Sequence, residues 1–275
     1  EIEGVMGENQ MGLQARVNGK LADAYAILSA DPDYRDTKEA IYQTGVAASS
    51  EKLYEVSVPA FTQVGAYKDA AMKLTMDTYA WGGQLFDNAD YDKSAEVFAS
   101  MGEFSDAPIR ANEARYAAAG VSMKNGSYDD AAARYAALGS YSDSADKAKA
   151  AAYAAADEQL EAGSYADAKA RFTKLGGYSD SKSKAQECDY RPAMALFNNG
   201  EYVAAKTAFV ALGSYSNSAD MAKECDYIPA KALYTAKQYQ DALNAFFSVQ
   251  AAQEIVAGSA QLFFLDADGV EVIDV

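Results

Sequence analysis

The sequence predicts an all-α fold, an α-solenoid of about six and a half helix–turn–helix repeats followed by a short C-terminal β-hairpin. The main observation is a tyrosine that recurs every 37 residues, with a small residue three positions later and an aromatic residue seven positions later. Offsets of 0, 3 and 7 fall on one side of a helix. A single helix pair cannot bury its own apolar face, so such a repeat indicates a stack with one continuous core.

A short helix begins at each recurring tyrosine and is expected to end at a glycine eleven residues later, such as Gly65 or Gly176. Glycine is the usual residue just after a helix, because it adopts positive φ without strain. The starting tyrosines are Tyr54, Tyr91, Tyr128, Tyr165, Tyr202 and Tyr239, and the aromatic residues are Phe61, Phe98, Tyr135, Phe172, Phe209 and Phe246.

A longer helix is expected after each turn. An Asp or Asn four residues beyond the glycine, such as Asp69 or Asn217, is typical of the N-cap of a helix. The longer helix carries a tyrosine, and three residues later a position that is always Gly or Ala. A side chain that small allows a partner helix to approach closely.

These spacings divide residues 1–252 into seven units near 8–36, 37–73, 74–110, 111–147, 148–184, 185–221 and 222–252, with residues 253–275 as a tail or the start of a further domain. The first unit is degraded, because Leu21 and Leu28 replace the aromatic residues. The last unit loses the pattern after Phe246. Terminal repeats are commonly atypical.

One segment resembles the tetratricopeptide repeat in its key residues, Ala193, Leu196, Gly200, Tyr202, Ala205 and Phe209. The period is 37 residues here, against 34 in that family. The turn at residues 139–144 is similar to the Leu-Gly-x-Tyr-x-Asp-Ser repeats common in Firmicutes proteins. The resemblance implies a right-handed superhelix whose concave groove, lined by the first helix of each pair, binds peptides or proteins. It implies no chemistry.

Composition narrows the possible partners. The formal net charge of −16 disfavours nucleic acids and anionic membranes, and it favours basic or neutral polar protein surfaces. The chain has no histidine, the commonest general base and zinc ligand, so we expect neither a metal nor a cofactor. Cys188 and Cys225 occupy the same place in successive repeats and are expected to be buried and free.

The tyrosines of the longer helices form the candidate ligand-binding set. They are Tyr79, Tyr116, Tyr153, Tyr190 and Tyr227. Two interpretations stay open, because a tyrosine has an apolar ring and a polar tip. The rings could pack between helices, or they could line the surface that a ligand contacts.

Residues 261–275 read as a β-hairpin with a tight turn at Asp268–Gly269. The adjacent residues Leu262, Phe263, Phe264 and Leu265 would be apolar on both faces of a strand, so they are the candidate assembly residues. Such a tail could cap the last helices of its own chain, dock on another copy, or begin a further domain.

Three functions follow as hypotheses. The first is a non-catalytic scaffold that binds a protein or peptide. The second is a structural subunit of a cell-surface or filamentous assembly that uses the tail for subunit contacts. An enzyme is the third, and the sequence offers no catalytic constellation for it. The chain begins at Glu1, so we expect a mature or excised segment. A secreted or cell-surface bacterial location is the preferred hypothesis, and a cytoplasmic one is the alternative.

Overall fold

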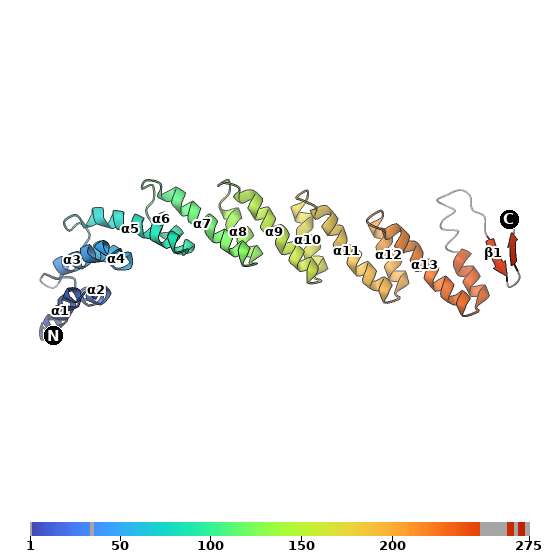
Figure 1. Ribbon diagram of the computed structural model, residues 1–275, viewed down its shortest axis with the longest axis horizontal. Coiled ribbons are helices and arrows are strands. Elements are labelled where there is room, and N and C mark those ends of the chain that lie inside the picture. Colours follow the sequence, from blue (N-terminus) through green and yellow to red (C-terminus); the bar gives the residue numbers. More distant parts are fainter. Residues whose placement is uncertain (1, 34–35, 248–262, 267–268, 273–275) are drawn as a thin grey trace. The chain divides into compact units, whose positions relative to one another are not determined.

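The computed structural model in Figure 1 describes residues 2–33, 36–247, 263–266 and 269–272. The chain divides into two compact units, residues 1–151 and 152–275, and each is described by itself.

Both units consist of alternating long and short helices. The first unit contains α1 (Ile2–Val17), α2 (Leu21–Leu28), α3 (Thr37–Ser50), α4 (Tyr54–Val64), α5 (Ala70–Asp87), α6 (Tyr91–Ser100), α7 (Ala107–Lys124) and α8 (Tyr128–Ala137). Helix α9 (Ser144–Glu161) begins in the first unit and continues into the second. The second unit adds α10 (Tyr165–Leu175), α11 (Ser181–Asn198), α12 (Tyr202–Leu212) and α13 (Ser218–Thr235), and residues 239–247 are also helical.

The helical repeats are confirmed within the described residues. Each short helix from α4 to α12 begins at its predicted tyrosine. Each long helix from α5 to α13 begins directly after the Asp or Asn of the turn, as predicted, for example at Ala70 after Asp69. The division of the chain into seven units stays a prediction.

The glycine that ends each short helix is required by the backbone. Gly176 has φ 62° and ψ −110°, and Gly65 has φ 61° and ψ −123°. Residues with a Cβ rarely adopt this conformation, and only glycine reaches it without strain. The sequence therefore stops the short helix and turns the chain at the same place in the repeats that carry Gly65, Gly102, Gly139, Gly176 and Gly213.

The aromatic residue of the short helix fills the core of each repeat. Phe61, Phe172 and Phe209 are fully buried. The long helix approaches so closely that a Cβ at Gly45 would lie 2.9 Å from the Phe61 ring, and one at Gly82 would lie 2.8 Å from the Phe98 ring. This contact leaves no room for a Cβ at Gly45 and Gly82. Later repeats hold nothing larger than alanine at the same place, in agreement with the predicted close approach of the helices.

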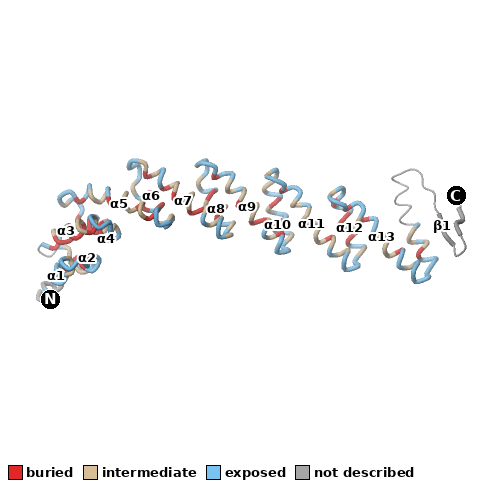
Figure 2. The backbone as a smooth tube through the Cα atoms, viewed as in Figure 1, coloured by how far each residue is buried: buried red, intermediate tan, exposed pale blue. Residues whose placement is uncertain are grey.

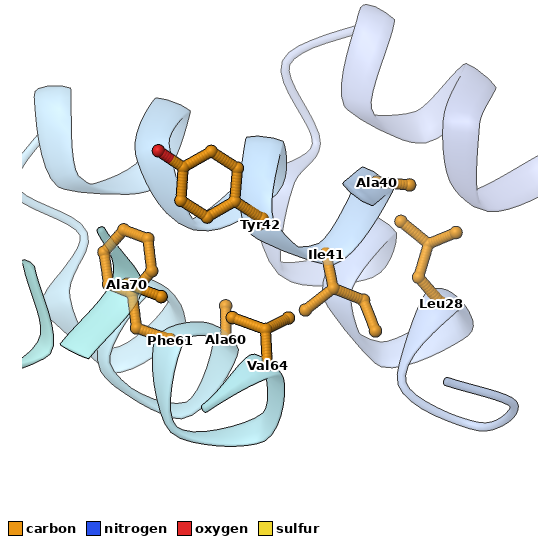
Figure 3. Close-up of a cluster of buried hydrophobic side chains, with 8 residues drawn as sticks. All are labelled: Leu28, Ala40, Ile41, Tyr42, Ala60, Phe61, Val64 and Ala70. Atoms are coloured by element: carbon orange, nitrogen blue, oxygen red, sulfur yellow. The ribbon is translucent and has the colours of Figure 1, made fainter. Parts of the chain in front are cut away.

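Buried residues lie where helices face one another within each unit, and the outward sides of the helices are exposed (Figure 2). One core cluster joins α2, α3, α4 and the start of α5, and Figure 3 shows Tyr42 packed at its edge with its hydroxyl oxygen pointing away from the cluster. A second joins α11, α12 and α13 around Phe209. A short helix thus shares its core with the long helices before and after it.

Near the C-terminus, strand β1 (Phe263–Asp266) pairs with β2 (Gly269–Val272) in antiparallel register. Gly269 pairs with Asp266 in this register. Residues 267–268 and Leu262 lie outside the described residues. The tight hairpin turn stays a prediction.

Replacement of Phe172 by Ala should lower the free energy of unfolding by about 3–5 kcal/mol, because the change leaves a cavity in a core shared by α9, α10 and α11. Urea unfolding measures the difference. Thr173→Ala, on the exposed side of the same helix, is the control and should change stability by less than about 0.5 kcal/mol. Equal stability of the two variants would contradict the assignment of Phe172 to the core.

Candidate functional site

The tyrosines of the long helices hold the start of the next long helix. Each hydroxyl donates a hydrogen bond to a side-chain oxygen 27 residues later. The pairs are Tyr42–Asp69, Tyr79–Asp106, Tyr116–Asp143 and Tyr153–Asp180 at 2.5 Å, and Tyr190–Asn217 at 2.6 Å. We call these bonds the repeat clasps.

The clasps use the residue that the sequence analysis assigned as an N-cap. Asp69, Asp106, Asp180 and Asn217 do stand at the N-cap position of α5, α7, α11 and α13, but none of these side chains caps its own helix. The side chain binds the tyrosine of the preceding repeat in place of the helix N–H groups. One residue therefore begins a helix through its backbone and joins two repeats through its side chain.

The clasps of Tyr42 and Tyr153 shift the pKa values of both partners. The hydrogen bond from Tyr42 lowers the pKa of the Asp69 carboxyl, and the same bond raises the pKa of Tyr42 to about 12. In the second unit the Tyr153 hydroxyl lowers the pKa of Asp180. Burial, followed by the bond to Asp180, raises the pKa of Tyr153 to about 12. The ionised carboxylate and the neutral phenol are thus the forms that the fold favours.

The rings of these tyrosines are packed as well as bonded. The Tyr153 ring lies 5.4 Å from the Phe172 ring and 6.0 Å from the Tyr178 ring, and Tyr79 contacts Phe98 and Phe104 in the same way. The packing interpretation is therefore visible in the structure, whereas contact with a ligand stays a prediction. Tyr227 packs on Phe246, and the residue 27 positions after Tyr227 lies outside the described residues.

Three large apolar side chains are exposed on the long helices α5 and α7. They are Met72, Met76 and Ile109, which are 58%, 61% and 58% exposed, and we call this set the methionine patch. At about 100° per residue, Met72 and Met76 lie opposite the buried stripe of α5. Ile109 stands 37 positions after Met72, in the same place on α7. The Tyr79–Asp106 clasp ties the two helices together.

The same positions on other long helices are mostly polar or charged. The position of Met76 is occupied by Glu113 on α7 and by Glu187 on α11. The position of Met72 is occupied by Asp146 on α9. These carboxylates lie near basic side chains, with Glu113 3.5 Å from Arg110 and Glu187 2.7 Å from Arg191. The methionine patch is therefore an apolar exception on the outer face of the long helices, which is polar in most other repeats.

A buried carboxylate was missed by the sequence analysis. Asp77 of α5 is 7% exposed and accepts hydrogen bonds from the hydroxyls of Ser57 (2.5 Å) and Ser49 (2.9 Å). It stands in the slot that holds Cys188 and Cys225 in later repeats, so alignment of the repeats by position would have revealed it. Three side chains from α3, α4 and α5 meet there, and they hold those helices together.

The cysteines match their prediction. Cys188 and Cys225 are free and buried, and burial raises the pKa of both thiols. Among the described residues no group of three or more His, Cys, Asp or Glu side chains is placed to hold a metal ion. The described helices include none long and apolar enough to cross a membrane.

No known protein family and no curated protein matches the chain. Among solved structures it is similar to the TPR domain of P58(IPK), with 16% sequence identity over 93% of this chain and 75% of that one, and a TM-score of 0.23. It is also similar to the apo form of RapI, with 14% identity over 93% of this chain and 100% of that one, and a TM-score of 0.22. TM-scores this low do not support an assignment of fold or function. The helical repeat is shown by the series of helix pairs in the structure.

Replacement of Tyr153 by Phe removes one clasp and keeps the ring. We expect the free energy of unfolding to fall by about 1 kcal/mol near neutral pH, the net value of a hydrogen bond that stays partly open to solvent. Urea unfolding at about pH 3, 7 and 11 measures this difference between the parent and the variant.

The difference should shrink at both ends of the pH range. The pKa of Asp180 is lowered in the folded state, so its contribution is present above the ordinary value of 3.8 and is lost as the pH falls through the lowered pKa. The pKa of Tyr153 is raised from 10.0 to about 12, so its contribution is present below pH 10 and is lost as the pH rises toward 12. Equal stability of the two proteins at all three pH values would contradict the clasp.

Proposed function

We propose that the chain is a non-catalytic scaffold that binds a protein or peptide on the outer face of its long helices. The observation that carries this proposal is the methionine patch, three large apolar side chains each more than half exposed on neighbouring helices. Exposed apolar groups that gather on a charged protein are typical of interaction sites.

The patch has the properties of a binding surface. Methionine is unbranched and flexible, so it adapts to side chains of different shapes. Complete burial of one such side chain contributes about 1.5–3 kcal/mol. Tyr79 lies three residues after Met76, on the same side of α5, and its clasp with Asp106 keeps the ring in place. The tyrosines thus supply a rigid border to the patch, which is the role we propose for Tyr79 and Tyr116.

The net charge of −16 favours a partner with basic residues beside its apolar ones. Complementary charge mainly accelerates the encounter and excludes wrong partners, whereas the buried apolar contacts slow dissociation. We therefore expect binding to weaken moderately in high salt without being abolished.

Selection from a displayed random-peptide library tests the proposal. Peptides that bind the chain should lose affinity by at least about tenfold for a Met72→Ser, Met76→Ser double variant, because two apolar contacts of about 1 kcal/mol or more are removed. Calorimetric titration of the selected peptides against the parent and the variant provides the measurement.

Met11→Ser is the matched control, because Met11 is also 61% exposed but lies on α1, away from the methionine patch. Peptide affinity should be unchanged in this variant. Selected peptides that bind the parent and the double variant equally, or a library that yields no binders, would argue against a binding role for this face.

The second candidate function is a structural subunit that associates through its C-terminal tail. The supporting observation is the antiparallel pairing of Phe263–Asp266 with Gly269–Val272. A two-stranded sheet is marginal in water, and its unpaired edges can pair with a strand of another chain. In this proposal Leu262, Phe263, Phe264 and Leu265 provide the contact between subunits.

Truncation after Ser259 distinguishes the two candidates. If the tail joins subunits, the full chain should associate with rising concentration, and the truncated chain should be a monomer of similar thermal stability. Light scattering and thermal unfolding measure both properties. A monomeric full chain, together with a truncated chain that melts earlier, would make the tail a cap on its own chain and exclude this assembly.

A further inference from the structure

A second surface lies on the other side of the first unit, over the short helices. It is an open hollow of about 720 Å³ lined by α2, α4, α5 and α6. The side chains that matter here are Tyr25, Val58, Pro59 and Trp81, with Glu55 and Lys93 at the rim. The hollow shares no residue with the methionine patch.

Trp81 is the only tryptophan of the chain, and its ring is held in place at the hollow. The Lys93 ammonium lies 5.2 Å from the centre of the Trp81 ring, a cation–π distance. Lys93 is itself fixed by a 2.8 Å ion pair with Glu55 of α4. The aromatic surface is therefore positioned before any ligand arrives, so little ordering is needed on binding.

Two hydrogen-bond donors in the hollow have no partner. Within the part of the chain that the structure describes, neither the Tyr25 hydroxyl nor the Trp81 indole N–H makes a hydrogen bond, although Tyr25 is buried enough to raise its pKa. Neither atom is sealed from solvent, so each donor can exchange water for an acceptor on a ligand. The hollow thus combines aromatic faces, apolar side chains and two donors without a partner in the described part of the protein.

We propose that this hollow binds a proline-rich segment of a partner protein in the polyproline II conformation. Such a segment has no internal backbone hydrogen bonds, so its carbonyl groups are free to accept from Tyr25 and Trp81. Its proline rings stack on aromatic side chains, which is how aromatic-lined grooves recognise this conformation. An amphipathic helix uses its backbone carbonyls internally, so it would offer these donors only side-chain acceptors.

The charge at the rim selects basic flanking residues. The Glu55 carboxylate is 69% exposed despite its pair with Lys93. Outside the hollow, Asp92 of α6 is 65% exposed despite its pair with Arg134. An arginine beside the prolines would approach these carboxylates in a chain of net charge −16. The occupant is thus a proline-rich segment flanked by arginine or lysine.

Tryptophan fluorescence tests this assignment directly, because all emission comes from Trp81. The probe is a synthetic decaproline flanked by two arginines at each end. We expect a saturable change in emission below about 1 mM peptide. A glycine–serine peptide of the same length and charge should give no change, which separates proline recognition from simple charge attraction.

Two variants locate the site. Tyr25→Phe keeps the ring and Trp81 but removes one donor, so affinity should fall about fivefold, as expected for one hydrogen bond. Met76→Ser, on the opposite face, should bind the decaproline peptide like the parent. Circular dichroism confirms that both variants keep the helical fold.

Three results would overturn the assignment. One is the absence of any emission change with the decaproline peptide at 1 mM. Another is a stronger response to an amphipathic basic helix than to decaproline. The third is an emission change on raising the protein concentration alone, which would indicate a second copy of the chain as the occupant. None of these results bears on the methionine patch, so the proposed function is tested separately.

Discussion

The packing of one aromatic ring per short helix is the contact on which the rest of the structure depends. Phe61, Phe172 and Phe209 are fully buried, and each lies in a cluster that includes residues of the long helices before and after it. The ring requires Gly or Ala on the facing long helix, and it supports the ring of the clasp tyrosine. Since this contact uses the inner side of every helix, the outer sides are free to vary.

Different residues of each repeat therefore serve stability and recognition. The buried ring, the glycine at positive φ and the Tyr–Asp clasp recur from repeat to repeat, whereas the outward residues do not. Met76, Ala150 and Glu187 occupy one equivalent position and give three surfaces of different chemistry. Trp81 likewise stands at a position where a later repeat has Pro192. Both proposed binding surfaces occur where a repeat departs from its neighbours in an outward or rim position.

The sequence predicted where the helices begin and end, because each boundary depends on local spacing. Tyr54 and Gly65 predicted the two ends of a short helix, and Gly45 predicted a close contact between helices. The partner of Asp69 was not predictable in the same way, since a side chain at an N-cap can bind its own helix or a neighbour, and the 27-residue separation of the clasp appears only after folding. Both candidate surfaces also escaped prediction, because exposure of Met76 and the missing acceptor of Trp81 are properties of the folded chain.

Hydrogen exchange of a Phe209→Ala variant tests most directly whether the buried ring joins neighbouring helices. The core around Phe209 contains residues of α11, α12 and α13, so loss of the ring should raise amide exchange in all three helices together. Mass spectrometry of peptides from each helix would resolve the effect. Faster exchange confined to α12, with α11 and α13 protected as in the parent, would contradict the account.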